Sequence, residues 1–268
     1  MKRRFLSLCV ALCFCAGVWA YTNPILPYDY SDPDVCRAGN GYYMTSSSFN
    51  CTPGLQILHS ADLIHWNLID AALPDYVPGT EDEITPQYGG GVWAPSIRYH
   101  NGRFYIYYGD PDRGIYCVRS EETATLPCRW EQAVLVKHGK GLIDPCPLWD
   151  NDGRVYLVHA FAGSRAGFKS ALAVCELSSD GLSVLTESRL VFDGHPDNPT
   201  CEGPKFYKRN NYYYIFCPAG GVSTGWQLVM RSRSPYRSRY TAQNRTTASS
   251  WSYRRIPPAY IRPRQPRP

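Results

Sequence analysis

The sequence predicts an all-β fold of the β-propeller type, and two observations carry that prediction. A strand, a tight turn and a second strand occur four times, and the turns at Gly41, Gly102, Gly153 and Asn211 lie 61, 51 and 58 residues apart. No helical periodicity separates the four copies. Repeats of this length, each with several short strands, are typical of propeller blades.

The third copy, residues 142–159, shows the pattern most clearly. Asp152-Gly153 is a strong hairpin signal, and the segments beside it are apolar and rich in β-branched or aromatic residues. Each repeat has room for four short strands. We therefore expect blades at about residues 31–66, 93–136, 144–192 and 202–233.

A short polar or aromatic segment precedes the first strand of each repeat. These segments are Ser31-Asp32-Pro33-Asp34, Trp93-Ala94-Pro95-Ser96, Asp144-Pro145-Cys146-Pro147 and Glu202-Gly203-Pro204-Lys205. The first strand of every propeller blade lines the central channel, so we expect Asp32, Asp144 and Glu202 to meet at the axis. Like charges in a confined channel raise the cost of ionising one another, so their convergence indicates chemistry.

The first twenty residues read as a secretory signal peptide. Residues 2–4 are Lys-Arg-Arg, residues 5–18 form a short apolar core, and Val18-Trp19-Ala20 resembles a small-x-small cleavage site. The core is too short to span a membrane, and no later segment is long enough. We therefore expect a secreted or periplasmic protein. A lipoprotein is the weaker alternative, because no small residue precedes the cysteines of the apolar core.

The 248 residues that follow suffice for one large all-β domain. Cys117 and Cys128 could form a disulfide across a short loop in an oxidising compartment, and buried free thiols are an equal interpretation of the cysteines. No CxxC pair or other metal-ligand spacing occurs, so the sequence predicts neither a zinc site nor a cofactor.

The net charge of +5 belongs to the end of the chain. No Asp or Glu follows Gly203, and ten arginines lie between Arg231 and Arg267. No basic stripe accompanies the aromatic residues of the repeats. Nucleic acid is therefore not an expected partner.

The motifs of the repeats resemble those of glycoside hydrolase family 43 over residues 23–236. In the family's order they are Asn-Pro-Ile-Leu, Ser-Asp-Pro-Asp, Tyr-Tyr-Met-Thr-Ser-Ser-Ser-Phe, Gly-Val-Trp-Ala-Pro-Ser, Asp-Pro-Cys-Pro-Leu and Glu-Gly-Pro. The resemblance implies a five-bladed propeller that hydrolyses xylosides or arabinosides of plant cell-wall polysaccharides. It also implies that Asp32 is the general base, Glu202 the general acid, and Asp144 the residue that orients the acid and modulates its pKa.

Hydrolysis with inversion at the sugar carbon needs these residue types. A protonated carboxyl group donates to the leaving oxygen, and a carboxylate about 6.5–9.5 Å away activates water on the opposite face of the sugar. Asp32 and Glu202, on different blades, can supply that separation across the channel. A third carboxylate near Glu202 raises the pKa of the acid by like-charge repulsion, and Asp144 fits that task.

Other side chains near the channel have competing interpretations. Trp93 and Phe49 are either core residues or surfaces on which a sugar ring stacks. Asp34 is most simply a turn residue, and His159 a hydrogen-bonded structural histidine. His195, in a loop before the fourth repeat, is a weaker candidate for a substrate contact.

The family pattern ends at Tyr236. Residues 237–268 are basic, rich in Arg and Pro, and without alternating apolar residues, so they predict a disordered tail and an incomplete propeller confined to residues 21–236. The family's fifth blade and its axial histidine are missing, which leaves no metal ligand to assign and two open sheet edges. We therefore expect about four blades and weak or no activity. A frameshift near codon 236 explains the change of composition, and an evolved basic tail is the alternative.

Two other functions stay open at this stage. The five-bladed fructan and sucrose hydrolases use a retaining mechanism and an Asn-Asp-Pro-Asn segment, from which Ser31-Asp32-Pro33-Asp34 departs. A non-catalytic carbohydrate-binding propeller would keep the fold and the aromatic channel without turnover.

Overall fold

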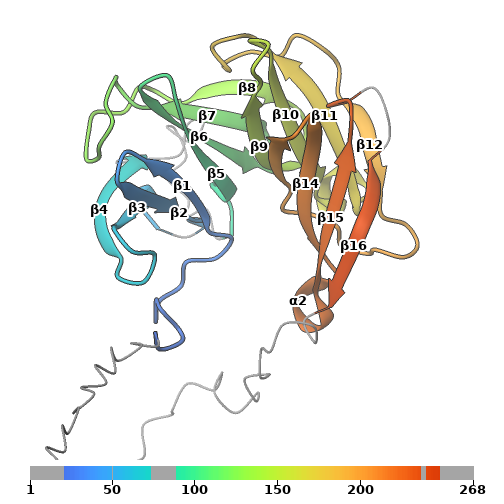
Figure 1. The fold of residues 1–268 in the computed structure, drawn as a ribbon, viewed down its shortest axis with the longest axis horizontal. Helices are drawn as coiled ribbons and strands as arrows, with labels where there is room; N and C mark the ends of the chain where they lie inside the picture. The colour runs from blue at the N-terminus through green and yellow to red at the C-terminus, as the bar shows by residue number, and fades with distance from the viewer. Residues whose placement is uncertain (1–20, 50, 74–88, 237–239, 248–268) are drawn as a thin grey trace, which may run out of the picture.

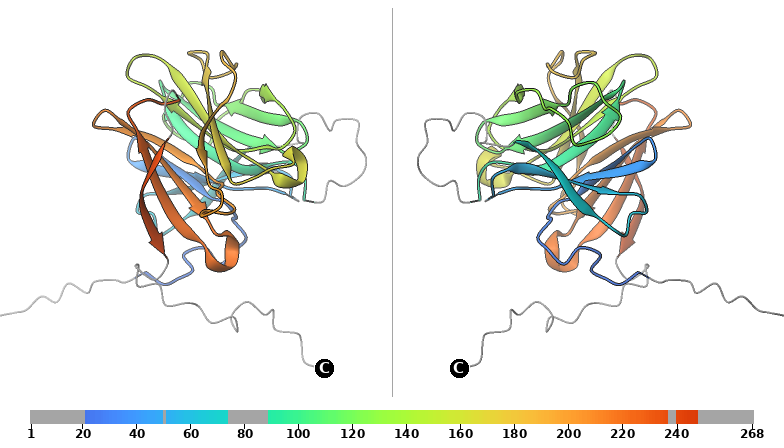
Figure 2. Two further views of the ribbon diagram at one scale, coloured as in Figure 1. Left: turned by 90° about the vertical axis from the view of Figure 1, so that its right-hand side faces the viewer. Right: turned by 90° about the vertical axis from the view of Figure 1, so that its left-hand side faces the viewer.

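Four antiparallel sheets of four strands make up the protein (Figure 1). The structure is a computed structural model that describes residues 21–49, 51–73, 89–236 and 240–247. In each sheet the strands are hydrogen-bonded in chain order. The sheets follow one another around an arc from the blue first blade to the orange fourth, and side views show them fanned about one axis (Figures 1 and 2). The predicted propeller arrangement with four blades is therefore confirmed.

Each blade is one such sheet. The first contains β1 (Asp34–Ala38), β2 (Gly41–Thr45), β3 (Gly54–Ser60) and β4 (Asn67–Leu73). The second contains β5 (Trp93–His100), β6 (Arg103–Asp110), β7 (Gly114–Arg119) and β8 (Val134–His138). The third contains β9 (Leu142–Trp149), β10 (Val155–Phe161), β11 (Ala171–Leu177) and β12 (Arg189–Asp193). The fourth contains β13 (Lys205–Arg209), β14 (Tyr212–Ala219), β15 (Trp226–Ser232) and β16 (Thr241–Thr247). The short helices are α1 (Gly163–Ala166) and α2 (Gly221–Thr224).

Two of the inner hairpins turn where the sequence predicts. His100 pairs with Arg103 around one two-residue turn, and Arg209 pairs with Tyr212 around another. Both central residues of these turns have positive φ: 45° and 78° in Asn101-Gly102, and 49° and 61° in Asn210-Asn211. Such turns match the twist of the paired strands, which is why Asn and Gly mark them in the sequence.

The hydrophobic core is divided among the spaces between successive blades. Inner strands β1, β5, β9 and β13 contact one another in that order around the axis. One buried cluster joins the first and second blades, another the second and third, and a third cluster the third and fourth. The second and third blades are therefore covered on both faces, which accounts for the continuous buried runs in β6 and β10.

Strand β16 corrects the prediction for the end of the chain. It pairs with β15 from Trp226↔Thr247 to Arg231↔Thr241, so the prediction of a disordered tail from residue 237 is wrong for residues 241–247. Tyr240 is buried, and its backbone N–H donates to the Val191 carbonyl of the third blade at 2.9 Å. Backbone pairing at the free edge of β15 needs no alternation of apolar side chains, so the pattern did not reveal it. The predicted signal peptide, residues 1–20, and residues 248–268 lie outside the described residues.

The cysteines within the described ranges are free thiols. Cys117 belongs to the cluster between the second and third blades, whereas Cys128 packs on the cluster between the first and second. The suggested disulfide between them is therefore wrong. Among the described residues, no helix has the length and hydropathy that a membrane crossing requires.

Candidate active site

The four segments that precede the inner strands share one backbone conformation. The residue before the proline has a φ of 51° at Asp32, 33° at Ala94, 56° at Asp144 and 62° at Gly203. Residues other than glycine rarely adopt positive φ. Its recurrence in all four blades shows that these positions are structurally equivalent, and all four residues line one pocket.

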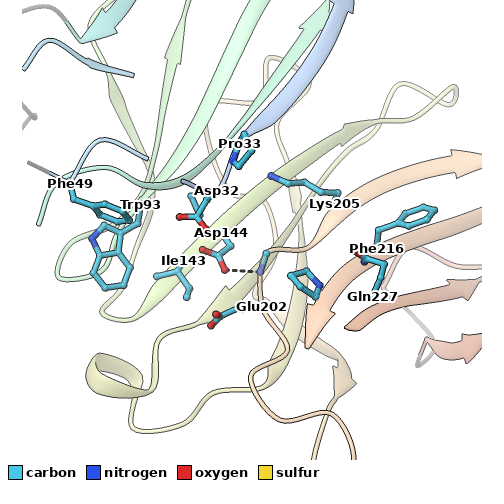
Figure 3. A pocket seen from close by; sticks show the side chains of 13 residues that line it. Asp32, Pro33, Phe49, Trp93, Ile143, Asp144, Glu202, Lys205, Phe216 and Gln227 are labelled. Carbon is cyan, nitrogen blue, oxygen red and sulfur yellow. Dashed lines mark hydrogen bonds between the residues drawn. The ribbon is translucent and has the colours of Figure 1, made fainter. Parts of the chain in front are cut away.

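This pocket brings together the five predicted site residues. It has a volume of about 510 Å³ and is lined by Asp32 from the first blade, Asp144 from the third and Glu202 from the fourth. Figure 3 shows the three acids side by side, with Phe49 and Trp93 to one side of them. The two aromatic rings meet edge to face, with centroids 6.0 Å apart. Blade symmetry therefore gathers residues that are far apart in the sequence.

Asp32 is oriented by a serine that the sequence did not single out. Ser47 Oγ donates to Asp32 Oδ2 at 2.7 Å and accepts from the backbone N–H of Ala94 at 2.8 Å. Ser47 is buried two residues after the end of β2. It lies in the Ser46-Ser47-Ser48 run of the family motif, which was the available signal. The hydrogen-bond pair fixes the Asp32 carboxylate relative to the second blade.

Asp144 is buried and holds the backbone that carries Glu202. Its Oδ2 accepts a 2.7 Å hydrogen bond from the N–H of Gly203, the next residue after Glu202 (Figure 3). Burial raises the pKa of Asp144 to about 7. The Gly203 hydrogen bond and the Lys205 charge oppose this shift, while the carboxylates of Glu202 and Asp32 add to it. The contact places Asp144 where it can orient Glu202.

Glu202 is half-buried in the same pocket. Burial raises its pKa, the Lys169 ammonium group opposes the rise, and the Asp32 carboxylate adds to it. The shift of Glu202 is therefore due chiefly to burial, whereas repulsion between Glu202 and Asp144 contributes to the pKa of Asp144. A carboxyl group with a raised pKa keeps its proton to higher pH, as a general acid requires.

Asp34 does not form a turn, so that prediction is wrong. It begins β1 with 6% of its surface exposed, and its Oδ2 accepts from Arg98 Nη1 at 2.5 Å. Its Oδ1 lies 3.4 Å from Lys205 Nζ. Asp34 stands two residues after Asp32, at the start of the inner strand β1. Lys205 also lines the pocket and was missed, although it stands directly after the Glu-Gly-Pro motif.

The two histidines differ in their surroundings. His159 is fully buried, its Nε2 lies 2.8 Å from Ser188 Oγ, and burial lowers its pKa to about 4, so the structural interpretation is confirmed. His195 is exposed beside Asp193 and is not among the residues that line the pocket. Within the described ranges, no three His, Cys, Asp or Glu side chains are grouped so that they could hold a metal ion.

The fold and the pocket together define a class of β-propeller with three acids gathered at its axis. A profile of glycosyl hydrolases family 43 matches residues 21–255. The chain belongs to that family, as its motifs indicated.

Several named relatives of the chain are xylosidases or arabinofuranosidases. It is 40% identical over 236 residues to a putative β-xylosidase of Xylanibacter ruminicola, covering 86% of this chain and 42% of the relative. It is 31% identical to a non-reducing end α-L-arabinofuranosidase of Bacteroides ovatus, covering 85% and 43%. The crystal structure of a xylan β-1,4-xylosidase from Bacillus halodurans superposes with a TM-score of 0.72 at 28% identity, covering 84% and 43%. The chain thus spans less than half the length of these relatives.

Proposed function

We propose that the protein hydrolyses xylosides or arabinosides from plant cell-wall polysaccharides or oligosaccharides, with inversion at the sugar carbon. The observation that carries the proposal is the meeting of Asp32, Asp144 and Glu202, from three blades, in one pocket. The names of the β-xylosidase and arabinofuranosidase relatives support the choice of sugar.

In this mechanism Glu202 is the acid and Asp32 the base. Glu202 donates its proton to the glycosidic oxygen as the bond to the sugar carbon breaks, and the alcohol leaves. Asp32 accepts a proton from a water molecule, whose oxygen bonds to the same carbon from the opposite face. Exchange with solvent then returns a proton to Glu202 and removes one from Asp32.

Asp144 and the aromatic pair support these steps. Asp144 holds the Gly203 N–H at 2.7 Å and so orients the neighbouring Glu202. The raised pKa of Glu202 comes chiefly from its burial, with a further contribution from the Asp32 carboxylate. Phe49 and Trp93 offer apolar ring surfaces beside the acids, which suit the C–H face of a pentose.

The direct test is product analysis by proton NMR with 4-nitrophenyl β-D-xyloside and 4-nitrophenyl α-L-arabinofuranoside. The first product of the xyloside should be α-xylose. A β-xylose first product would refute inversion and favour a retaining mechanism. We expect slow turnover, because the described blades number four and the family resemblance implies a fifth wall to the channel.

A carbohydrate-binding module without turnover is the second candidate, since the aromatic wall of the pocket, formed by Phe49 and Trp93, can bind sugar by itself. Glu202→Gln separates the two functions. If the parent chain hydrolyses a xyloside and the variant binds xylobiose without hydrolysing it, the enzyme is supported. If the parent chain binds xylobiose and shows no turnover, the binding module is supported.

A further inference from the structure

A ring of four side chains adjoins the pocket along the inner strands, and its member Lys205 also lines the pocket. In every blade it is formed by the residue after the proline of the repeated segment. Its members are Asp34, Ser96, Cys146 and Lys205. They are structurally equivalent, because the residues before those prolines share the same positive φ.

The first three members each bond to the next blade. The bonds are Ile97 N–H to Asp34 Oδ2 at 2.9 Å, Ser96 Oγ–H to the Pro145 carbonyl at 2.6 Å, and Phe206 N–H to Cys146 Sγ at 3.2 Å. In the first and third bonds, the donor is the backbone N–H of the residue directly after the ring member of the next blade. These donors are Ile97, which follows Ser96, and Phe206, which follows Lys205. In the second bond the corresponding position is Pro147, which has no N–H, so the serine hydroxyl donates instead.

Lys205 makes the fourth connection, which joins the fourth blade to the first and second blades. Its Nζ lies 3.4 Å from Asp34 Oδ1 in the first blade and donates to the Pro95 carbonyl of the second blade at 3.3 Å. The set of contacts therefore runs from the first blade through the second and third to the fourth, and then returns across the channel.

This connection joins the two segments that carry the proposed base and acid. Asp34 stands two residues after Asp32, and Lys205 stands three residues after Glu202. The side chains of Asp34 and Lys205 are 6% and 24% exposed, so solvent screens their attraction weakly. A shift of Lys205 would move the backbone of Glu202 relative to that of Asp32.

We propose that Lys205 is a positioning residue that sets the separation between the carboxyl groups of Asp32 and Glu202 by tying the fourth blade to Asp34 across the channel. The catalytic meaning of that separation rests on the proposed function. The contact itself does not, so the two can fail separately.

Lys205 has a second effect that can be measured without any substrate. The groups that act on the Asp144 carboxyl are Glu202, Asp32, Lys205 and the Gly203 N–H, and Lys205 is the cation among them. Its removal should raise the pKa of Asp144. Lys169 acts on Glu202 and is not among the groups that shift Asp144, so it supplies a matched control.

The test compares Lys205→Met, Lys205→Arg and Lys169→Met in the full chain. Crystal structures should show a changed Asp32–Glu202 carboxyl separation in Lys205→Met alone. Carboxyl ¹³C NMR should show the pKa of Asp144 raised in Lys205→Met. Hydrogen exchange should show lost protection of the Ile97 amide in that variant. Lys205→Arg should restore all three, and Lys169→Met should leave them unchanged.

An unchanged separation together with an unchanged pKa of Asp144 in Lys205→Met would overturn the proposal. If Lys205→Met does not fold, Lys205→Gln removes the same charge with a shorter polar side chain and is judged by the same measurements. Where the parent chain hydrolyses a xyloside, Lys205→Met should lower kcat more than it raises KM. A chain without turnover would refute the proposed function and leave the separation and the titration of Asp144 as tests.

Discussion

Two buried aspartates on the axis, Asp144 in the pocket and Asp34 in the ring that adjoins it, have opposite electrostatics. Their exposed fractions are similar, 8% and 6%. Burial acts to raise the pKa of both, and Asp144 ends at about 7. For Asp34, Arg98, Lys205 and the Ile97 N–H outweigh burial and hold its pKa below the usual value.

The comparison shows that charged neighbours, and not burial alone, decide whether the pKa of a buried carboxyl group is raised or lowered. Asp34 is paired with cations, and a paired buried charge contributes to structure so long as its partners stay in place. Asp144 faces two other acids, and unpaired acids with raised pKa values are typical of sites of proton transfer. Asp32 and Asp34 lie on the boundary between the two regions, only two residues apart in the sequence.

The largest effect on the pocket side of this comparison is expected from Asp32→Asn. Loss of the base should lower kcat by about 10²- to 10⁴-fold, while the midpoint of urea unfolding stays close to that of the parent chain. Steady-state kinetics and urea titration measure the two quantities. Asp29→Asn is the matched control, since Asp29 is an exposed residue that accepts a hydrogen bond from Ser31. Equal kcat values for both variants would remove Asp32 from the chemistry.

The ring that adjoins the pocket should respond in the opposite way. Arg98→Met leaves Asp34 buried without its 2.5 Å partner, so the free energy of unfolding should fall by about 3–5 kcal/mol. Arg129→Met breaks an exposed ion pair with Glu121 and should cost at most about 1 kcal/mol. Chemical denaturation measures both. Similar losses in the two variants would show that burial does not distinguish these pairs.

The pH dependence of stability should have opposite signs for the two aspartates. Because the folded-state pKa of Asp144 lies above its unfolded value of 3.8, the stability that it contributes falls as pH rises from about 4 to 7 and then levels off. Asp34 has a lowered pKa, so its contribution is present above its unfolded pKa and is lost as pH falls through the folded one.

Asp144→Asn should therefore reduce the decline in unfolding free energy between about pH 4 and pH 7. The expected change is on the order of 2–4 kcal/mol. Denaturant titrations at several pH values in this range measure it in the parent chain and the variant. Parallel curves for the two proteins would contradict the raised pKa.

The smallest effect should come from the aromatic wall of the pocket. Phe49→Ala or Trp93→Ala removes one ring surface beside the acids and should weaken xylobiose binding by about 0.5–1.5 kcal/mol, with little change in kcat. Isothermal titration calorimetry measures the affinity. Tyr28→Ala is the control, because Tyr28 is 76% exposed and is not among the pocket residues. An unchanged affinity for xylobiose in both pocket variants would show that Phe49 and Trp93 serve packing and not sugar binding.

Local features of the sequence were sufficient for the blades and for the meeting of the acids. Turn residues such as Asn101-Gly102 and Asn210-Asn211 specify their hairpins through φ alone, so blade number and strand order follow from them. The repeat then places equivalent positions at one axis. Asp32 and Asp144 occupy such equivalent positions, and Glu202 stands one residue before the equivalent Gly203, so the sequence predicted that the three acids meet in one pocket.

Tertiary structure alone decided which charges are paired. The sequence predicted Asp34 as a turn residue and assigned no role to Lys205. Their partners come from other blades, 64 and 171 residues away in the pairs Asp34–Arg98 and Asp34–Lys205. Likewise β16 is a strand because β15 offers it a free edge, and not because of its own pattern. Periodicity along the chain is a local property that the sequence carries by itself, whereas ion pairing and edge pairing depend on which segments the packed blades bring together.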